Sequence, residues 1–259
     1  LGQPLSEDVQ ATLTEDVLWM ELVEVDGNQV MVPRLYLSQA TKDRLEADGQ
    51  GPSVFADVVA LEDTSLNLES GLFNSNTIAG SASSVTNAED SKIKSAVFNV
   101  TSKGDVTNSG LIESSELLSV TTTEGDIKVD GSLKSGGMLN LDSTGNITVT
   151  AGHIESGGSA YLFAKNNLEF LADEDPLGMN NVVSTLTVGG NLVTDSGGDT
   201  TLQATDVSVA ELAYIKTGGD LNLTTVTDKS DNTEVIEDGN TTTVRRVIEE
   251  KERGVDLTV

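Results

Sequence analysis

The sequence predicts an all-β protein whose main part is a parallel β-solenoid with about 20–21 residues in each coil. A motif of Gly or Asn, then Asp or Asn, then an aliphatic residue starts at Gly104, Gly125, Gly145 and Asn166, at intervals of 21, 20 and 21 residues. Apolar and polar residues alternate within each repeat, which is typical of strands rather than helices. Apolar positions also recur at the repeat distance, so they form continuous columns when the repeats are stacked.

Aligning the repeats predicts four such columns. They are Phe98, Leu118, Leu139 and Ala160; Val100, Val120, Leu141 and Leu162; Val106, Ile127, Ile147 and Leu168; and Ile112, Leu133 and Ile154. Further along, Leu186 is expected over Val207, Val188 over Val209, and Leu202 over Leu223. Each coil then holds three strands of three to five residues, and each strand pairs in parallel with its counterpart one coil on, about 4.8 Å away. A single coil buries too little to fold alone, so the stack is the stable unit.

The chain divides into four predicted parts. They are an N-terminal β module at 1–53, the β-solenoid at 54–227 with a loop insertion at 172–184, a β-hairpin excursion at 228–254, and the start of a further coil at 255–259. In the N-terminal module we expect strands at 17–25 and 29–33 joined by a turn at Gly27, and a short helix at 39–47.

Composition excludes several functional classes. The chain has 42 acidic and 15 basic residues and a net charge of −27, so we predict no nucleic-acid partner. Cysteine is absent, which removes disulfides, thiolate catalysis and cysteine-based metal sites. Only 3% of the residues are aromatic, so the core has to be thin and aliphatic. The longest apolar run, at 160–164, is far too short to span a membrane, and the N-terminus lacks the basic and apolar regions of a signal peptide.

No catalytic, cofactor-binding or metal-binding residue is predicted, and no cofactor. His153 is the only histidine, and we interpret it as a surface residue because a triad or a histidine-rich metal site needs partners that we do not find in the sequence. Asp173, Glu174 and Asp175 offer oxygen ligands for calcium, although adjacent acidic residues are more often a solvated loop. The block with Trp19 and Tyr36 could be a docking surface, but core packing of the small module is the preferred interpretation.

Two further groups of residues have alternative interpretations. The first group consists of asparagines in N-x-[ST] sequons, which arise by chance in a chain rich in Asn and Thr: Asn99, Asn146, Asn222 and Asn240. The second is the only basic cluster, which could contact a partner but more simply offsets Glu249, Glu250 and Glu252: Arg245, Arg246, Lys251 and Arg253.

The repeats at 65–226 and the block at 17–37, with Trp19, Gly27, Pro33 and Tyr36, together resemble the filamentous haemagglutinin family of two-partner-secreted bacterial exoproteins. That family includes the large effectors of contact-dependent growth inhibition. The resemblance implies a right-handed parallel β-helix and a secreted or cell-surface location. For the parent chain it implies an outer-membrane two-partner-secretion transporter as partner.

We therefore expect a non-enzymatic structural and presentation segment of a secreted adhesin or growth-inhibition exoprotein, forming a rigid rod for adhesion or toxin delivery. One alternative is a module that binds a target-cell receptor or glycan through the loop at 173–181 or the hairpin at 233–248. The other is a β-helical polysaccharide-degrading enzyme. A hydrolase of that kind needs two carboxylates about 5–10 Å apart across a cleft. A lyase needs cationic groups, yet no arginine lies between Leu45 and Val244.

Overall fold

The computed structural model describes residues 5–6, 9, 12–14, 17–25, 28–36, 38, 53–174, 179–238 and 241–259. Contacts divide the chain into two units, Leu1–Ser53 and Val54–Val259. Every element whose bounds the structure describes is a β-strand, which confirms the all-β prediction. No helix among those residues is long and apolar enough to cross a membrane.

The first unit contains a two-stranded antiparallel sheet. Strand β1 (Val17–Val25) pairs with β2 (Asn28–Tyr36) along its whole length. Both predicted strands are therefore present, and the second extends beyond the predicted end at Pro33. The Tyr36 side chain is buried, and its hydroxyl accepts a hydrogen bond from the Leu5 backbone N–H at 3.2 Å. The side chain of Trp19 and the predicted helix at 39–47 lie outside what the structure describes.

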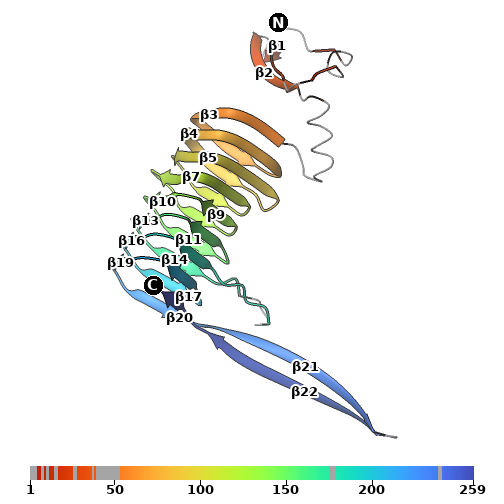
Figure 1. The fold of residues 1–259 in the computed structure, drawn as a ribbon, viewed down its shortest axis with the longest axis vertical. Coiled ribbons are helices and arrows are strands. Elements are labelled where there is room, and N and C mark those ends of the chain that lie inside the picture. The colour runs from red at the N-terminus through yellow and green to blue at the C-terminus, as the bar shows by residue number, and fades with distance from the viewer. Residues whose placement is uncertain are drawn as a thin grey trace. The chain divides into compact units, whose positions relative to one another are not determined.

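The second unit is a solenoid of about eight coils, in which each strand pairs in parallel with strands of the preceding and following coils (Figure 1). Its strands are β3 (Ser53–Leu68), β4 (Gly71–Asn87), β5 (Ser91–Ser102), β6 (Val106–Asn108), β7 (Leu111–Thr122), β8 (Ile127–Val129), β9 (Ser132–Ser135), β10 (Met138–Ser143), β11 (Ile147–Thr150), β12 (His153–Ser156), β13 (Ala160–Ala164), β14 (Leu168–Leu171), β15 (Thr185–Val188), β16 (Leu192–Ser196), β17 (Thr200–Gln203), β18 (Asp206–Val209), β19 (Ala213–Thr217), β20 (Leu221–Thr224) and β23 (Asp256–Thr258).

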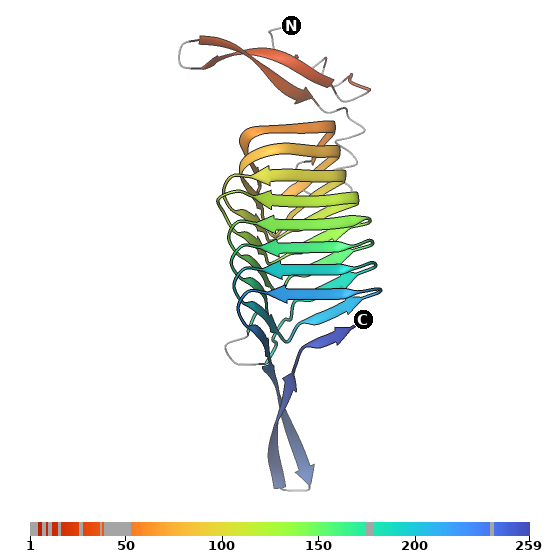
Figure 2. The same cartoon turned by 90° about the vertical axis from the view of Figure 1, so that its left-hand side faces the viewer.

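Three faces run along the solenoid. The first face contains β10, β13, β16 and β19, the second β8, β11, β14, β17 and β20, and the third β9, β12, β15, β18 and β23. In Figure 2 the strands nearest the viewer all point to the left as the chain descends, and this sense of winding is right-handed. The right-handed parallel β-helix is therefore confirmed.

The predicted columns are confirmed residue by residue. Leu118 pairs with Leu139, and Leu139 pairs in turn with Ala160. Val120, Leu141 and Leu162 form the next column in the same register. These side chains are at most 1% exposed, so the aliphatic core runs as stacked layers along the solenoid. Adding apolar layers in register stabilises each coil through its neighbours, since most of its buried area is shared with them.

The strands of the first coils are longer than predicted. Strands β4 and β5 have 17 and 12 residues, whereas the sequence predicted three to five residues per strand throughout. They run continuously through the corner between the third and first faces, where β5 has only an irregularity between Ser95 and Val97. In the next three coils a glycine pair occupies this corner, at 136–137, 157–158 and 189–190, and separates the two strands. In those coils the pairing ends where the glycine pair turns the backbone sharply.

The Gly-Asp/Asn motif marks a ladder of side-chain hydrogen bonds between coils. The Asp105 carboxylate accepts from the backbone N–H of Asp126 at 2.9 Å, and the same contact is repeated at every later motif. The six ladder residues are Asp105, Asp126, Asn146, Asn167, Asp199 and Asp220. Glycine precedes most of them because a Cβ on Gly145 would lie 2.1 Å from the Asp126 Oδ1 atom below it. The motif is thus required by the geometry of stacking.

Replacing Asn146 by Ala tests this ladder. Asn146 Oδ1 accepts from the Asn167 N–H at 3.1 Å, and Asn146 Nδ2 donates to Asp126 Oδ1 at 3.2 Å. Without them a half-buried N–H loses its acceptor, and we expect the free energy of unfolding to fall by about 1–2 kcal/mol. The denaturant midpoint measures this loss, with the exposed Asn99→Ala as matched control. Equal midpoints for the two variants would show that the ladder contributes nothing.

The last coil exposes side chains at positions that face the core in earlier coils. Leu221 and Leu223 are 47% and 60% exposed, whereas Leu168 and Phe170, which precede them on the second face, are buried. Leu257, which follows Val207 on the third face, is 47% exposed. This coil therefore presents an open layer of aliphatic side chains.

Candidate functional site

The two segments that interrupt the repeat leave the solenoid at the same corner. This corner joins the second face to the third, and between β11 and β12 it consists only of Ala151 and Gly152. Residues 172–174 and 179–184 lie there after β14, and β21 (Val226–Asp238) and β22 (Thr241–Arg253) start and end there after β20. Strands β14, β17 and β20 lie in successive coils, so the two insertions are two coils apart. We call this part of the molecule the insertion corner.

The tight version of the corner needs an unusual backbone. Ala151 and Ala204 occupy the same place in two coils and have φ angles of 50° and 47°, in the left-handed region. Their N–H groups donate to the carbonyl groups of Leu171 and Thr224 in the following coil. Inserted segments at 172 and 226 therefore replace a strained two-residue turn without disturbing the strands on either side.

The loop at 172–184 is anchored at both ends. The backbone groups of Asp173 and Val182 exchange hydrogen bonds of 2.8 and 3.0 Å, which closes the base of the loop. Ser184 is buried and donates to the carbonyl of Leu171 at 2.6 Å. Gln203 of the next coil accepts from the Ala172 N–H and donates to the Glu174 carboxylate at 2.7 Å. The described part of the loop is thus fixed to the solenoid.

The hairpin formed by β21 and β22 starts from the same anchor. Val226 is buried against Ala172 and Ala204, and Val183 packs against this small cluster. The Asn181 side chain in the loop donates to the Thr227 carbonyl at 2.8 Å. A groove of about 460 Å³ lies between them, lined by Met179, Asn180, Asn181, Asp228, Lys229, Ser230, Glu249, Glu250 and Lys251. The loop and the root of the hairpin therefore form one structural unit with a polar groove.

Replacing Asn181 by Ala tests whether the loop holds the hairpin root. Losing this partly buried hydrogen bond is expected to speed amide exchange at the root of β21 and β22 about fivefold. Exchange measured by mass spectrometry reports it, with the exposed neighbour Asn180→Ala as control. Identical exchange rates in both variants would show that the loop does not stabilise the root of the hairpin.

The hairpin is confirmed, and it is longer than the two segments predicted to flank the turn. Its 13 facing pairs run from Val226 and Arg253 at the root to Asp238 and Thr241 at the tip, where Gly239 and Asn240 lie outside the described residues. Strands β21 and β22 form a separate two-stranded ribbon (Figure 1).

The basic cluster pairs differently from the prediction. Arg246 binds Asp231 on the facing strand through Nε, at 2.9 Å to Oδ1, and through Nη2 to Oδ2. This hydrogen bonding lowers the pKa of the Asp231 carboxyl. Arg253 lies 3.9 Å from Asp206 in the solenoid and from Asp228 in β21. The prediction that the cations offset the neighbouring glutamates in their own strand is wrong for these two arginines, because side chains that follow one another along a strand point to opposite faces.

The loop acids do not gather into a metal site in the described part of the chain. The Glu174 carboxylate accepts from Gln203, and Asp175 lies outside the described residues. Across the residues that the structure describes, no three His, Cys, Asp or Glu side chains lie close enough together to hold a metal ion.

His153 has neighbours that the sequence did not predict. It is the first residue of β12 and pairs in register with Thr185, whose hydroxyl contacts its Nδ1 atom. Its Nε2 atom lies 3.4 Å from the Glu155 carboxylate, and the hydrogen bond from Lys134, followed by that from His153, lowers the pKa of Glu155. The order hydroxyl, imidazole, carboxylate is that of a triad. However, the N–H groups of His153 and Thr185 donate within the strand ladder, so neither is available to stabilise an oxyanion.

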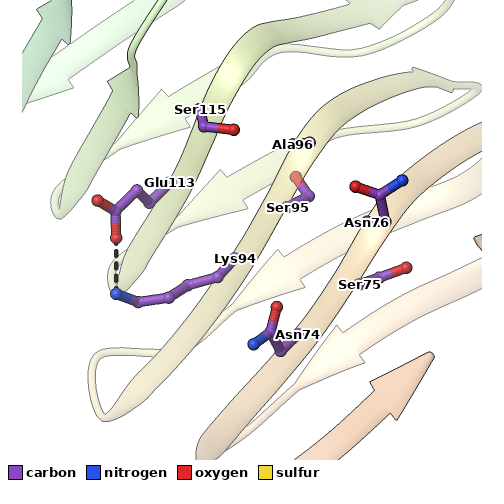
Figure 3. Close-up of a pocket in the computed structure, with 8 residues that line it drawn as sticks. All are labelled: Asn74, Ser75, Asn76, Lys94, Ser95, Ala96, Glu113 and Ser115. Atoms are coloured by element: carbon purple, nitrogen blue, oxygen red, sulfur yellow. Dashed lines mark ion pairs between the residues drawn. The ribbon is translucent and has the colours of Figure 1, made fainter. Parts of the chain in front are cut away.

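A second groove of about 490 Å³ lies on β4, β5 and β7 (Figure 3). Its lining residues are Asn74, Ser75, Asn76, Lys94, Ser95, Ala96, Glu113 and Ser115. Figure 3 shows Lys94 reaching towards Glu113, and the two charges are 2.8 Å apart. Glu113 is the single carboxylate in this lining and is paired, so the two-carboxylate arrangement of a glycosidase is not formed here. The amides and hydroxyls suit hydrogen bonding to a polar ligand.

Fold and site together define a right-handed parallel β-solenoid with paired insertions at one corner. Residues 173–237 match the family model for the hemagglutinin repeat. This match confirms the resemblance to the filamentous haemagglutinin family, and it spans the loop, the coils that follow it and β21. No curated protein and no solved structure matches the chain significantly.

Sequence reasoning identified both insertions but missed that they share a corner. The residues that join them are Asn181, Gln203 and Val226. The alignment of Leu202 with Leu223 already contained the necessary signal. Extending that column back to Phe170 places Ala172 and Thr225, the residue just before β21, at equivalent points of two coils.

Proposed function

We propose that the chain is a structural and presentation segment of a secreted bacterial surface adhesin or growth-inhibition exoprotein, without enzymatic activity of its own. The solenoid holds the insertion corner, and the loop and hairpin contact a receptor or glycan on the target cell. The observation that carries this proposal is the joint anchoring of two insertions on one corner, through a hydrogen bond between Asn181 and Thr227 that lies inside the segment matching the hemagglutinin repeat. Such repeats fit a surface adhesin exported by an outer-membrane two-partner-secretion transporter.

The composition supports export through a pore. A chain without cysteine cannot form a disulfide that would block threading in an unfolded state. Because one coil is unstable alone, coils that stack outside the membrane hinder movement back into the pore. The net charge of −27 disfavours side-by-side packing of neighbouring solenoids and association with anionic lipids.

Binding of the labelled chain to intact candidate target cells tests the proposal. A variant that lacks 226–253 and joins Thr225 to Gly254 removes the hairpin and restores a short corner. We expect this variant to lose most binding, while Asn99→Ala on the solenoid binds like the original chain. If the hairpin-deleted chain and a chain with a shortened 172–184 loop both bind as strongly as the original chain, the proposal is overturned. Release of reducing sugars or unsaturated uronates from polysaccharides would favour the enzyme instead.

A further inference from the structure

We propose that the free edge of β22 pairs in an antiparallel manner with β22 of a second copy of this chain, so that two molecules associate through their hairpins. In the part of the chain that the structure describes, β21 and β22 pair only with each other. Each therefore has an outer row of backbone N–H and C=O groups that can pair with a further strand. An isolated two-stranded hairpin is marginally stable in water, and a four-stranded sheet is more stable.

The two edges are not equivalent. The loop already engages β21, because Asn181 donates to the carbonyl of Thr227. Strand β21 carries five acidic residues and one lysine, so two β21 strands side by side would repel each other. Strand β22 carries four basic and three acidic residues, with the arginines at 245 and 246 and the glutamates at 249 and 250 on either side of an apolar pair. The β22 edge is therefore the one whose charges complement themselves.

Symmetry restricts the register. In an antiparallel pair with two-fold symmetry, facing residues lie on the same side of the sheet, so one residue must face its own copy. With Val247 at the axis, Arg245 faces Glu249 of the second copy and Glu249 faces Arg245 of the second copy. In this register no two residues of like charge face each other anywhere along the two β22 strands. With Ile248 at the axis, Arg245 would face Lys251 of the second copy, which is unfavourable.

The residues needed for this register are accessible. Arg245, Val247 and Glu249 alternate along β22, so they lie on one side of the hairpin, opposite to Arg246. Arg245 and Glu249 are exposed, and among the described side chains Glu249 has no ion-pair partner. Ile248, on the side of Arg246, is 55% exposed. Arg246 keeps its own partner, Asp231, so that pairing of two hairpins adds ion pairs without breaking this one.

Sedimentation velocity of the complete 259-residue chain over a wide concentration range tests the proposal. At physiological ionic strength the Debye length is about 8 Å, so distant repulsion between the acidic molecules is screened. We expect a monomer–dimer equilibrium for the original chain. Arg245→Glu and Glu249→Arg each place two like-charged pairs at the axis and should weaken association about tenfold or more. Mixing these two variants, or combining both changes in one chain, should restore it.

Two controls change the net charge equally at exposed solenoid positions, Lys128→Glu and Glu116→Arg, and both should associate like the original chain. The chain contains no cysteine, so Val247→Cys provides a second measurement. Residues that face each other across strands have the separation that a disulfide needs, so we expect Val247→Cys to form disulfide-linked dimers and Thr243→Cys not to.

The proposal is overturned if the original chain is monomeric at every concentration. It is equally overturned if Arg245→Glu and Glu249→Arg associate as the original chain does, which would indicate contact through another surface such as the open last coil. Disulfide-linked dimers of Thr243→Cys in place of Val247→Cys would exclude the proposed register.

Discussion

Replacing Leu141 by Asp is expected to unfold the central coils of the solenoid. Leu141 is fully buried in β10 and lies in register between Val120 and Leu162. A carboxylate placed there has no partner, and burying an unpaired charge costs about 4 kcal/mol or more. Because each coil is stable only through its neighbours, the loss extends to the adjacent coils. Circular dichroism during denaturant unfolding measures the effect as a large fall in the midpoint.

Met138 provides the matched control for this experiment. It lies in the same strand and is 44% exposed, so Met138→Asp introduces the same charge without burying it. We expect its unfolding midpoint to stay close to that of the original chain. A midpoint for Leu141→Asp equal to that of Met138→Asp would mean that the columns do not form a packed core.

The second large effect is expected at the glycine corner between the third and first faces. A Cβ on Gly157 would lie 2.3 Å from the carbonyl oxygen of Gly136 in the preceding coil. Backbone atoms cannot move aside as the end of a flexible side chain can, so the methyl group added by Gly157→Ala has to push the two coils apart locally. We expect the free energy of unfolding to fall by about 3 kcal/mol, which thermal unfolding measures as a lower midpoint.

Gly254 is the matched control for the glycine substitution. A Cβ there meets only the Thr225 Cγ2 atom, at an ordinary contact distance of 3.9 Å. Gly254→Ala should therefore unfold at nearly the same temperature as the original chain. If Gly157→Ala behaves in the same way, the coils are not in close contact at this corner.

The register of the core was predictable because it is repeated. Leu118, Leu139 and Ala160 are separated by 21 residues, and only parallel stacking places them all on one side of adjacent strands. The continuous strands β4 and β5 were not predictable in the same way. Their corners have Ser75 and Asn76 in β4 and Ser95 and Ala96 in β5 in place of glycine pairs, and whether pairing continues through such a corner depends on the neighbouring coils.

The candidate site was predictable only in part. Both insertions appear in the sequence as breaks in the period, but the contact between Asn181 and Thr227 joins residues 46 positions apart. No local pattern encodes such a contact, since it depends on how two insertions leave successive coils. The contact between His153 and Thr185 was missed for a related reason. The insertion at 172–184 lengthens this coil, so the residue that pairs with His153 is not one repeat length away in the sequence. The stacking of the coils is thus easier to predict than the contacts between the segments inserted into them.

Distances between spin labels along one outward-facing row of the second face test the stacking most directly. Thr107, Lys128, Thr148 and Asn222 belong to this row, and cysteines introduced there would be the only ones in the chain. Coils stacked about 4.8 Å apart place Asn222 about 19 Å from Lys128 and about 24 Å from Thr107. Pulsed electron paramagnetic resonance should find these distances growing by one constant step per coil. Distances that do not rise in order along the row would contradict the solenoid.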